Sequence, residues 1–128
     1  MKYLLDTHLL LWAISGDRRF PARARELLAE SGAEAFFSAA SVWEVAIKNG
    51  LPRRSLGIPA DAFRRECLAA GFRELSVGAR HAAAVESLPH RHEDPFDRIL
   101  LAQALEEDCT LLTHDTVLSA YGAPVQHV

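Results

Sequence analysis

Cysteine, lysine and long apolar runs are all scarce in this 128-residue chain. The two cysteines, Cys67 and Cys109, lack the spacing of a metal or redox motif and lie in apolar helical patterns, so we expect buried free thiols. No run approaches the ~18 apolar residues of a membrane-spanning helix. The chain also begins without the basic, apolar and small-residue order of a signal peptide. These absences predict a cytoplasmic protein with no membrane partner.

The remaining composition is that of an ordinary globular protein, with 49% hydrophobic and 24% charged residues. A chain of this length is near the modal size of one domain and can bury roughly two-thirds of its unfolded surface. We therefore predict a single domain over residues 1–128 that needs no disulfide or structural metal.

The balance of charge argues against a general nucleic-acid binder, because the net charge is −3 and the pI is about 6.0. Bound divalent metal would change this balance if several acids converged on it. Twelve of the fourteen basic residues are arginine, which suits phosphate recognition. Each arginine pair is nevertheless explained most simply as part of a solvated helix face.

Strand and helix patterns alternate along the chain. Strands are predicted over Tyr3–Leu5, Ala35–Ser38, Phe72–Val77, Thr110–Thr113 and Val125–Val128. Helices are predicted over His8–Ser15, Ala22–Ser31, Ser41–Asn49, Ala60–Ala70, Ala79–Leu88, Pro95–Glu107 and Thr116–Tyr121. This alternation is typical of an α/β protein with a parallel sheet between two layers of helices.

Four carboxylates fall at equivalent places in this pattern. Asp6 ends the first strand, Glu44 lies one turn into the helix after the second, Asp97 lies in the first turn of the 95–107 helix, and Asp115 follows the fourth strand. In a parallel sheet these positions meet at the carboxyl edge, where ligands bind. Four acids together repel one another, and hard divalent cations such as Mg²⁺ or Mn²⁺ relieve that repulsion.

Each acid also has a structural explanation. Ser41 and Glu44 have the spacing of a capping box, and Glu44 lies four residues before Lys48, as in an ordinary helical ion pair. Asp6 is positioned to cap the helix that follows it, and Asp115 to cap the last helix.

The start of the 95–107 helix leaves the third acid ambiguous. Asp94 is placed to cap this helix, Pro95 to occupy its first position, and Asp97 to meet its dipole. Asp94 is close enough to Asp97 to support it or to bind metal itself, although Asp97 is the preferred ligand.

Four carboxylates with Mg²⁺ perform the hydrolysis of phosphodiesters without a covalent nucleophile. Thr7 and Thr113 flank the predicted site and could orient water or a carboxylate, although backbone hydrogen bonding is the simpler role for Thr7. Four histidines, His8, His90, His92 and His114, could either contact phosphate or be solvent-facing loop residues, and the sequence does not decide between these roles.

Four stretches of the chain together form a recognisable ordered set: Leu4–His8, Ser41–Lys48, Pro89–Arg98 and Leu111–Asp115. In their order and their separations they resemble the PIN domain ribonucleases, specifically the VapC-type toxins of bacterial toxin–antitoxin pairs. The resemblance spans nearly the whole chain. The chain differs from the family pattern just after the last acid, where Val117 and Leu118 stand in place of a frequent aromatic residue. We expect this difference to affect packing and not chemistry.

The resemblance implies a PIN-like three-layer fold with a five-stranded parallel sheet in the order 3-2-1-4-5. It implies Mg²⁺- or Mn²⁺-dependent endonuclease activity on RNA, with Asp6, Glu44, Asp97 and Asp115 as the catalytic and metal-binding residues. It also implies a homodimer and a small cognate antitoxin. An antitoxin helix would require an apolar groove, for which Leu10, Leu11 and Trp12 are candidates.

Other functions fit the sequence less well. A phosphoryl-accepting receiver domain would need an acceptor Asp at the end of its third strand and a Lys after its last, and a dehalogenase-like phosphatase would need an Asp where His8 stands. Both are disfavoured. A catalytically silent PIN-fold binding module remains as the alternative.

Overall fold

The apolar run at the start of the chain forms the central strand, β1 (Lys2–Leu5), in the computed structural model, which describes residues 1–128. The strand is buried on both faces, because Tyr3 and Leu5 join one hydrophobic core and Leu4 joins the other. The interpretation of this run as the middle of a parallel sheet is therefore confirmed.

All five strands run parallel in the order β3-β2-β1-β4-β5, as predicted. The remaining strands are β2 (Glu34–Ser38), β3 (Arg73–Leu75), β4 (Thr110–Thr113) and β5 (Val125–His127). A receiver-like domain would have the order 2-1-3-4-5. The observed order excludes that alternative.

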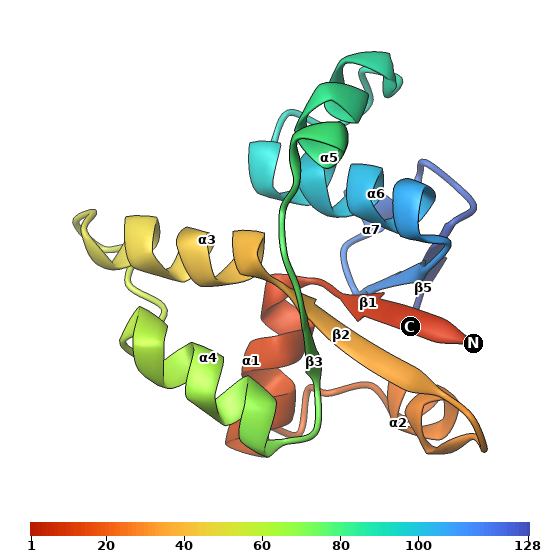
Figure 1. Ribbon diagram of the computed structural model, residues 1–128. Coiled ribbons are helices and arrows are strands. Elements are labelled where there is room, and N and C mark those ends of the chain that lie inside the picture. Colours follow the sequence, from red (N-terminus) through yellow and green to blue (C-terminus); the bar gives the residue numbers. More distant parts are fainter.

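Helices cover both faces of the sheet (Figure 1). On one face lie α1 (Thr7–Ser15), α2 (Ala22–Ala29) and α4 (Ala60–Ala69). On the other lie α5 (Ala79–Ala84), the short 3₁₀ helix η1 (Val85–Ser87), α6 (Pro95–Glu107) and α7 (Thr116–Ser119). The helix α3 (Ala39–Asn49) leaves the end of β2 and contributes to both cores through Val45 and Ala40.

Helix α3 begins earlier than the sequence pattern predicted, and this changes the role of Glu44. Ser38, at the end of β2, accepts a hydrogen bond from the amide of Ala40 and caps the helix. Ser41 therefore lies inside the helix, and the predicted Ser41–Glu44 capping box is wrong. The side chain of Glu44 is left free to contact other elements.

The other departures are short. The predicted 79–88 helix continues after Ala84 as η1, and the third strand is limited to Arg73–Leu75. Cys67 and Cys109 are buried free thiols, as expected, and burial raises the pKa of Cys67 to about 12. None of the helices has both the length and the apolar character that crossing a membrane requires.

Candidate metal centre

A cleft of about 240 Å³ opens at the carboxyl edge of the sheet. All four predicted acids line it, together with Asp94. The other lining residues are Thr7, His8, Trp12, Lys48 and His114. Five carboxylates thus face one ammonium group, so the cleft is strongly acidic although the chain as a whole is nearly neutral.

Asp6 is the most deeply buried aspartate of the cleft, with 6% of its surface exposed. Its Oδ1 accepts the amide of Leu9 and caps α1, as predicted, and its Oδ2 accepts the hydroxyl of Thr113. Burial raises the pKa of Asp6, while these two hydrogen bonds act in the opposite direction. A carboxylate in this position is costly to ionise unless a cation approaches it.

Glu44 reaches the cleft from α3 and is also buried. Thr7 donates a hydrogen bond of 2.6 Å to its Oε1 and also contacts the Ser41 hydroxyl at 2.9 Å. Lys48, one turn further along the helix, pairs with its Oε2, as the sequence spacing suggested. The hydroxyl of Thr7 is thus engaged with Glu44, so the expectation of backbone hydrogen bonding for Thr7 is wrong.

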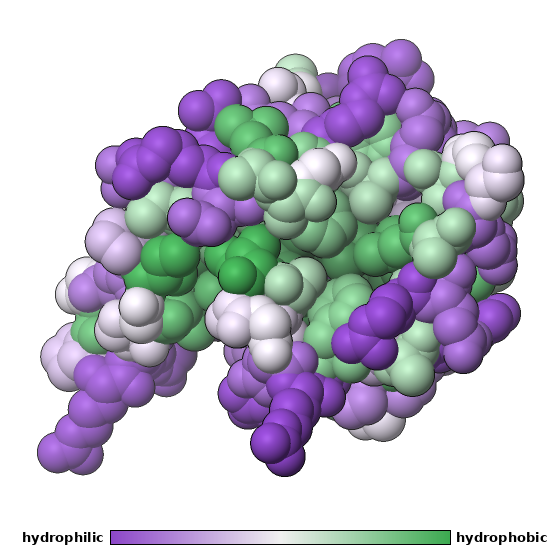
Figure 2. Space-filling view, turned by 90° about the horizontal axis from the view of Figure 1, so that it is seen from below, coloured by the Kyte–Doolittle hydropathy of each residue, from purple (hydrophilic) through white to green (hydrophobic).

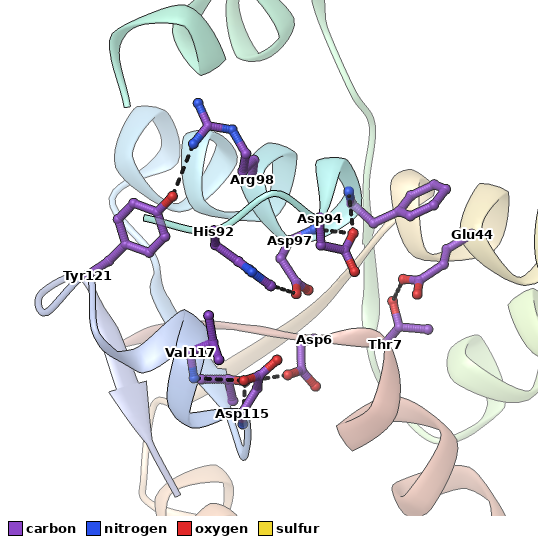
Figure 3. A network of polar contacts seen from close by, with 12 residues as sticks. Asp6, Thr7, Glu44, His92, Asp94, Asp97, Arg98, Asp115, Val117 and Tyr121 are labelled. Atoms are coloured by element: carbon purple, nitrogen blue, oxygen red, sulfur yellow. Dashed lines mark hydrogen bonds and ion pairs between the residues drawn. The ribbon is translucent and has the colours of Figure 1, made fainter. Parts of the chain in front are cut away.

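Asp97 lies on the first turn of α6 and faces Asp6 across the cleft (Figure 3). His92 Nε2 lies 2.6 Å from its Oδ2. Burial raises the pKa of Asp97 to about 7, with smaller contributions from the charges of Asp94 and Asp6, while the His92 contact lowers it. The carboxyl group of Asp97 therefore holds a proton far more readily than an exposed aspartate.

Asp94 and Asp115 both cap helices, as the sequence predicted. Asp94 Oδ1 accepts the amides of Phe96 and Asp97, and Asp115 Oδ1 accepts the amide of Val117. In each residue the other carboxylate oxygen, Oδ2, accepts no hydrogen bond within the chain. Oδ1 of Asp97 is free in the same way.

These free oxygens are the feature that fits a metal ion. Oxygen ligands from several carboxylates are what Mg²⁺ and Mn²⁺ prefer, and the buried acids lack sufficient positive charge from the protein. His92, Asp94 and Asp97 already bring one ligand atom each within 4.8 Å of one another. Asp6, Glu44 and Asp115 line the same cleft without joining that compact set. The donor set therefore suits a hard divalent cation.

The loop before α6 is held from behind by a buried arginine (Figure 3). Arg98 donates to the carbonyls of Val85 and Pro89 and to the hydroxyl of Tyr121. Tyr121 in turn donates to the Pro89 carbonyl at 2.9 Å. These contacts fix the path of the loop that carries His92 and Asp94 into the cleft.

The sequence pattern indicates the contacts of the site to different degrees. Its spacing gives the Glu44–Lys48 pair, it offers Thr113 as one of the possible orienting hydroxyls, and it leaves His92 open. The position of Thr113, two residues before Asp115 at a strand end, is the available signal. No local pattern indicates that His92 contacts Asp97, because the loop path depends on distant residues.

Comparison with known proteins identifies the family. The chain matches the PIN domain model over residues 3–124. It is 30% identical to Ribonuclease VapC22 of Mycobacterium tuberculosis over 122 residues, which covers 94% of this chain and 92% of the relative.

Several solved structures share the fold. VapBC2 from Rickettsia felis, bound to a promoter DNA fragment, has a TM-score of 0.70 at 14% identity, with 100% of this chain and 99% of that chain covered. A toxin–antitoxin complex from Klebsiella pneumoniae has a TM-score of 0.65 at 21% identity, with 97% and 95% covered. The fold, the family match and the VapC relative agree with the sequence resemblance. The chain belongs to the PIN domain family and is of its VapC type.

Proposed function

We propose that the chain is a metal-dependent endoribonuclease and the toxin of a toxin–antitoxin pair. The observation that carries this proposal is the convergence of five carboxylates from four separate segments on one cleft that contains one ammonium group. The name of the VapC22 relative supports the choice of RNA as substrate.

Asp6, Glu44, Asp97 and Asp115 are the proposed ligands for Mg²⁺ or Mn²⁺. When bound, such an ion polarises the phosphoryl oxygen and makes a bound water more acidic. The hydroxyls of Thr113 and Thr7 hold the Asp6 and Glu44 carboxylates in fixed orientations.

Lys48 and His92 have positioning roles in this proposal. Lys48 balances one negative charge at the Glu44 end of the cleft, and His92 restrains one oxygen of Asp97 so that the other faces the cleft. Asp94 stands beside Asp97 as a helix cap with one free oxygen. Its place beside Asp97 suits a supporting role, and its free oxygen also makes it a candidate additional ligand, as the sequence left open.

The proposed antitoxin would bind beside α1. Seen from below, the face that carries α1, α2 and α4 has apolar residues gathered across it, with hydrophilic residues around them (Figure 2). A groove of about 520 Å³ on this side is lined by Trp12, Phe20, Leu28 and Phe72 among others. Such a groove suits the apolar face of a helix. Leu10 is fully buried in the core, so its predicted place in the groove is wrong.

The homodimer, the cytoplasmic location and the single domain over residues 1–128 stay predictions. The dimer is checked by light scattering on the purified chain, where we expect twice the mass of one chain. A monomer at every concentration tested would contradict it.

The enzymatic proposal is tested by incubating the purified chain with a mixed pool of structured RNA. We expect cutting with Mg²⁺ or Mn²⁺, none with EDTA, and none by Asp6→Asn. Glu93→Gln serves as a matched control, because Glu93 belongs to the loop before α6 and does not line the cleft. Absence of both cutting and metal binding in the wild type would favour the silent binding module.

A further inference from the structure

One wall of the acidic cleft is aromatic. His8, Trp12 and His114 line it, and Trp12 is its one hydrophobic residue. The ring centroids of Trp12 and His114 are 5.7 Å apart at an interplanar angle of 69°, and those of His8 and Trp12 are 6.5 Å apart at 62°. The three rings thus form one continuous edge-to-face array beside the carboxylates.

The chain places these rings next to the acids for a simple geometric reason. His8 and Trp12 are four residues apart on α1, so they share a helix face, and His8 lies two residues after Asp6. His114 follows β4 directly and precedes Asp115. The aromatic wall and two of the proposed metal ligands therefore come from the same two strand ends.

The three rings are accessible to solvent, unlike aromatic rings packed in a hydrophobic core. His8 and His114 are exposed, and Trp12 is half-buried. The indole N–H of Trp12 donates no hydrogen bond in the chain. Every buried polar side-chain atom has a hydrogen-bond partner, so the indole N–H must be exposed to solvent. The orientation of the wall is nevertheless fixed, because the His114 Nδ1–H donates to the Val128 carbonyl at 2.7 Å and His127 stacks on the His114 ring.

An arginine held in an ion pair accompanies the rings. The guanidinium of Arg19 lies 5.2 Å from the centroid of Trp12, and Asp17 holds it at Nε and Nη2. The Arg19 side chain is 70% exposed. Asp17 neutralises its charge, so its contribution is an exposed guanidinium plane beside the aromatic rings, and bases stack on both kinds of surface.

We propose that His8, Trp12 and His114 form a stacking surface for an unpaired RNA base next to the phosphodiester that is cut. This inference rests on the proposed ribonuclease function and specifies its substrate, since only a single-stranded or flipped-out base exposes its faces. A partner protein is less favoured at this wall. Trp12 is shared with the adjoining apolar groove of Phe20, Leu28 and Phe72, whereas His8 and His114 line the acidic cleft and not that groove.

The test measures binding of random single-stranded RNA 12-mers that contain one 2-aminopurine, whose fluorescence falls on stacking. RNA binding is measured with Mg²⁺ present, using a chain that carries Asp97→Asn. Under the proposed function this variant binds RNA without cutting it. We expect fluorescence quenching, and an affinity loss of about 5- to 150-fold for Trp12→Leu and for His114→Leu. Trp43→Leu is the matched control, because Trp43 is exposed on α3 and lies outside the cleft.

His114→Leu keeps the test informative if Trp12→Leu fails to fold, since His114 is exposed. The stacking proposal is overturned if both variants bind and quench like Trp43→Leu. It is also overturned if they retain RNA affinity and lose only the cognate antitoxin. Failure of the proposed function looks different, because the wild type would then neither cut RNA nor bind metal.

Discussion

Replacing Asp97 by asparagine should stabilise the metal-free protein, and the gain should appear only as the pH rises above about 4. Burial raises the pKa of Asp97 from 3.8 to about 7 in the folded chain. Between these values the folded state binds more protons than the unfolded state, so the free energy of unfolding falls as the pH rises from about 4 through 7. Asp97→Asn removes the ionisation and with it this loss.

The magnitude follows from the size of the pKa change. At about 1.4 kcal/mol for each pKa unit, the change corresponds to about 4 kcal/mol at most. The side-chain amide that replaces the carboxyl group must itself be desolvated, and it lacks the charge interaction with His92. We therefore expect a net gain of about 1–3 kcal/mol at pH 8. For a chain of this size that is a rise in Tm of roughly 4–12 °C.

The assay is thermal unfolding in EDTA, followed by circular dichroism at pH values from 4 to 8.5. We expect the wild type and Asp97→Asn to differ little at pH 4 and to separate progressively up to pH 8. Glu93→Gln should follow the wild type throughout, since that acid lies outside the cleft. A constant difference between Asp97→Asn and the wild type at all pH values would contradict this prediction, because such a difference would come from packing and not from ionisation.

Three further outcomes are expected. Mg²⁺ at 100 times its Kd should stabilise the wild type by about 2.7 kcal/mol in thermal unfolding, and Asp97→Asn should show little of this gain. Thr113→Val should weaken Mg²⁺ binding in calorimetry at least several-fold and lower the Tm, because it removes the hydroxyl that donates to the buried carboxylate of Asp6. Unchanged Mg²⁺ binding would contradict the positioning role of this hydroxyl. Arg98→Met should lower the free energy of unfolding by about 2–4 kcal/mol in urea, because it leaves the Val85 and Pro89 carbonyls without their arginine donor. A loss below about 0.5 kcal/mol would contradict the role of Arg98 in holding the loop.

Much of this fold was predictable because its strongest signals are local. The apolar run of Tyr3, Leu4 and Leu5 indicates a strand buried on both faces, and the alternation of strands and helices then requires a parallel sheet. In such a sheet the residues after the strands meet at one edge. That rule places Asp6 and Asp115 at the same edge, and the strand order implied by the family resemblance, with β1 beside β4, makes them neighbours.

The contacts within the cleft were less predictable because they depend on distant residues. His92 reaches Asp97 only because Arg98 and Tyr121 hold the Pro89 carbonyl and so direct the loop. The start of α3 was missed for a different reason. Both Ser38 and Ser41 suit a helix cap, and the end of β2 selects the earlier one.

The location of a bound Mn²⁺ ion would decide whether the acidic cleft is a metal site. We would grow crystals of the chain with Mn²⁺ and locate the ion by its anomalous scattering. We expect a peak in the cleft, coordinated by oxygens of the proposed ligands Asp6, Glu44, Asp97 and Asp115 at about 2.0–2.4 Å. A peak bound only by His92 and Asp94 at the rim, or no peak in the cleft at all, would contradict the metal site and the hydrolysis built on it.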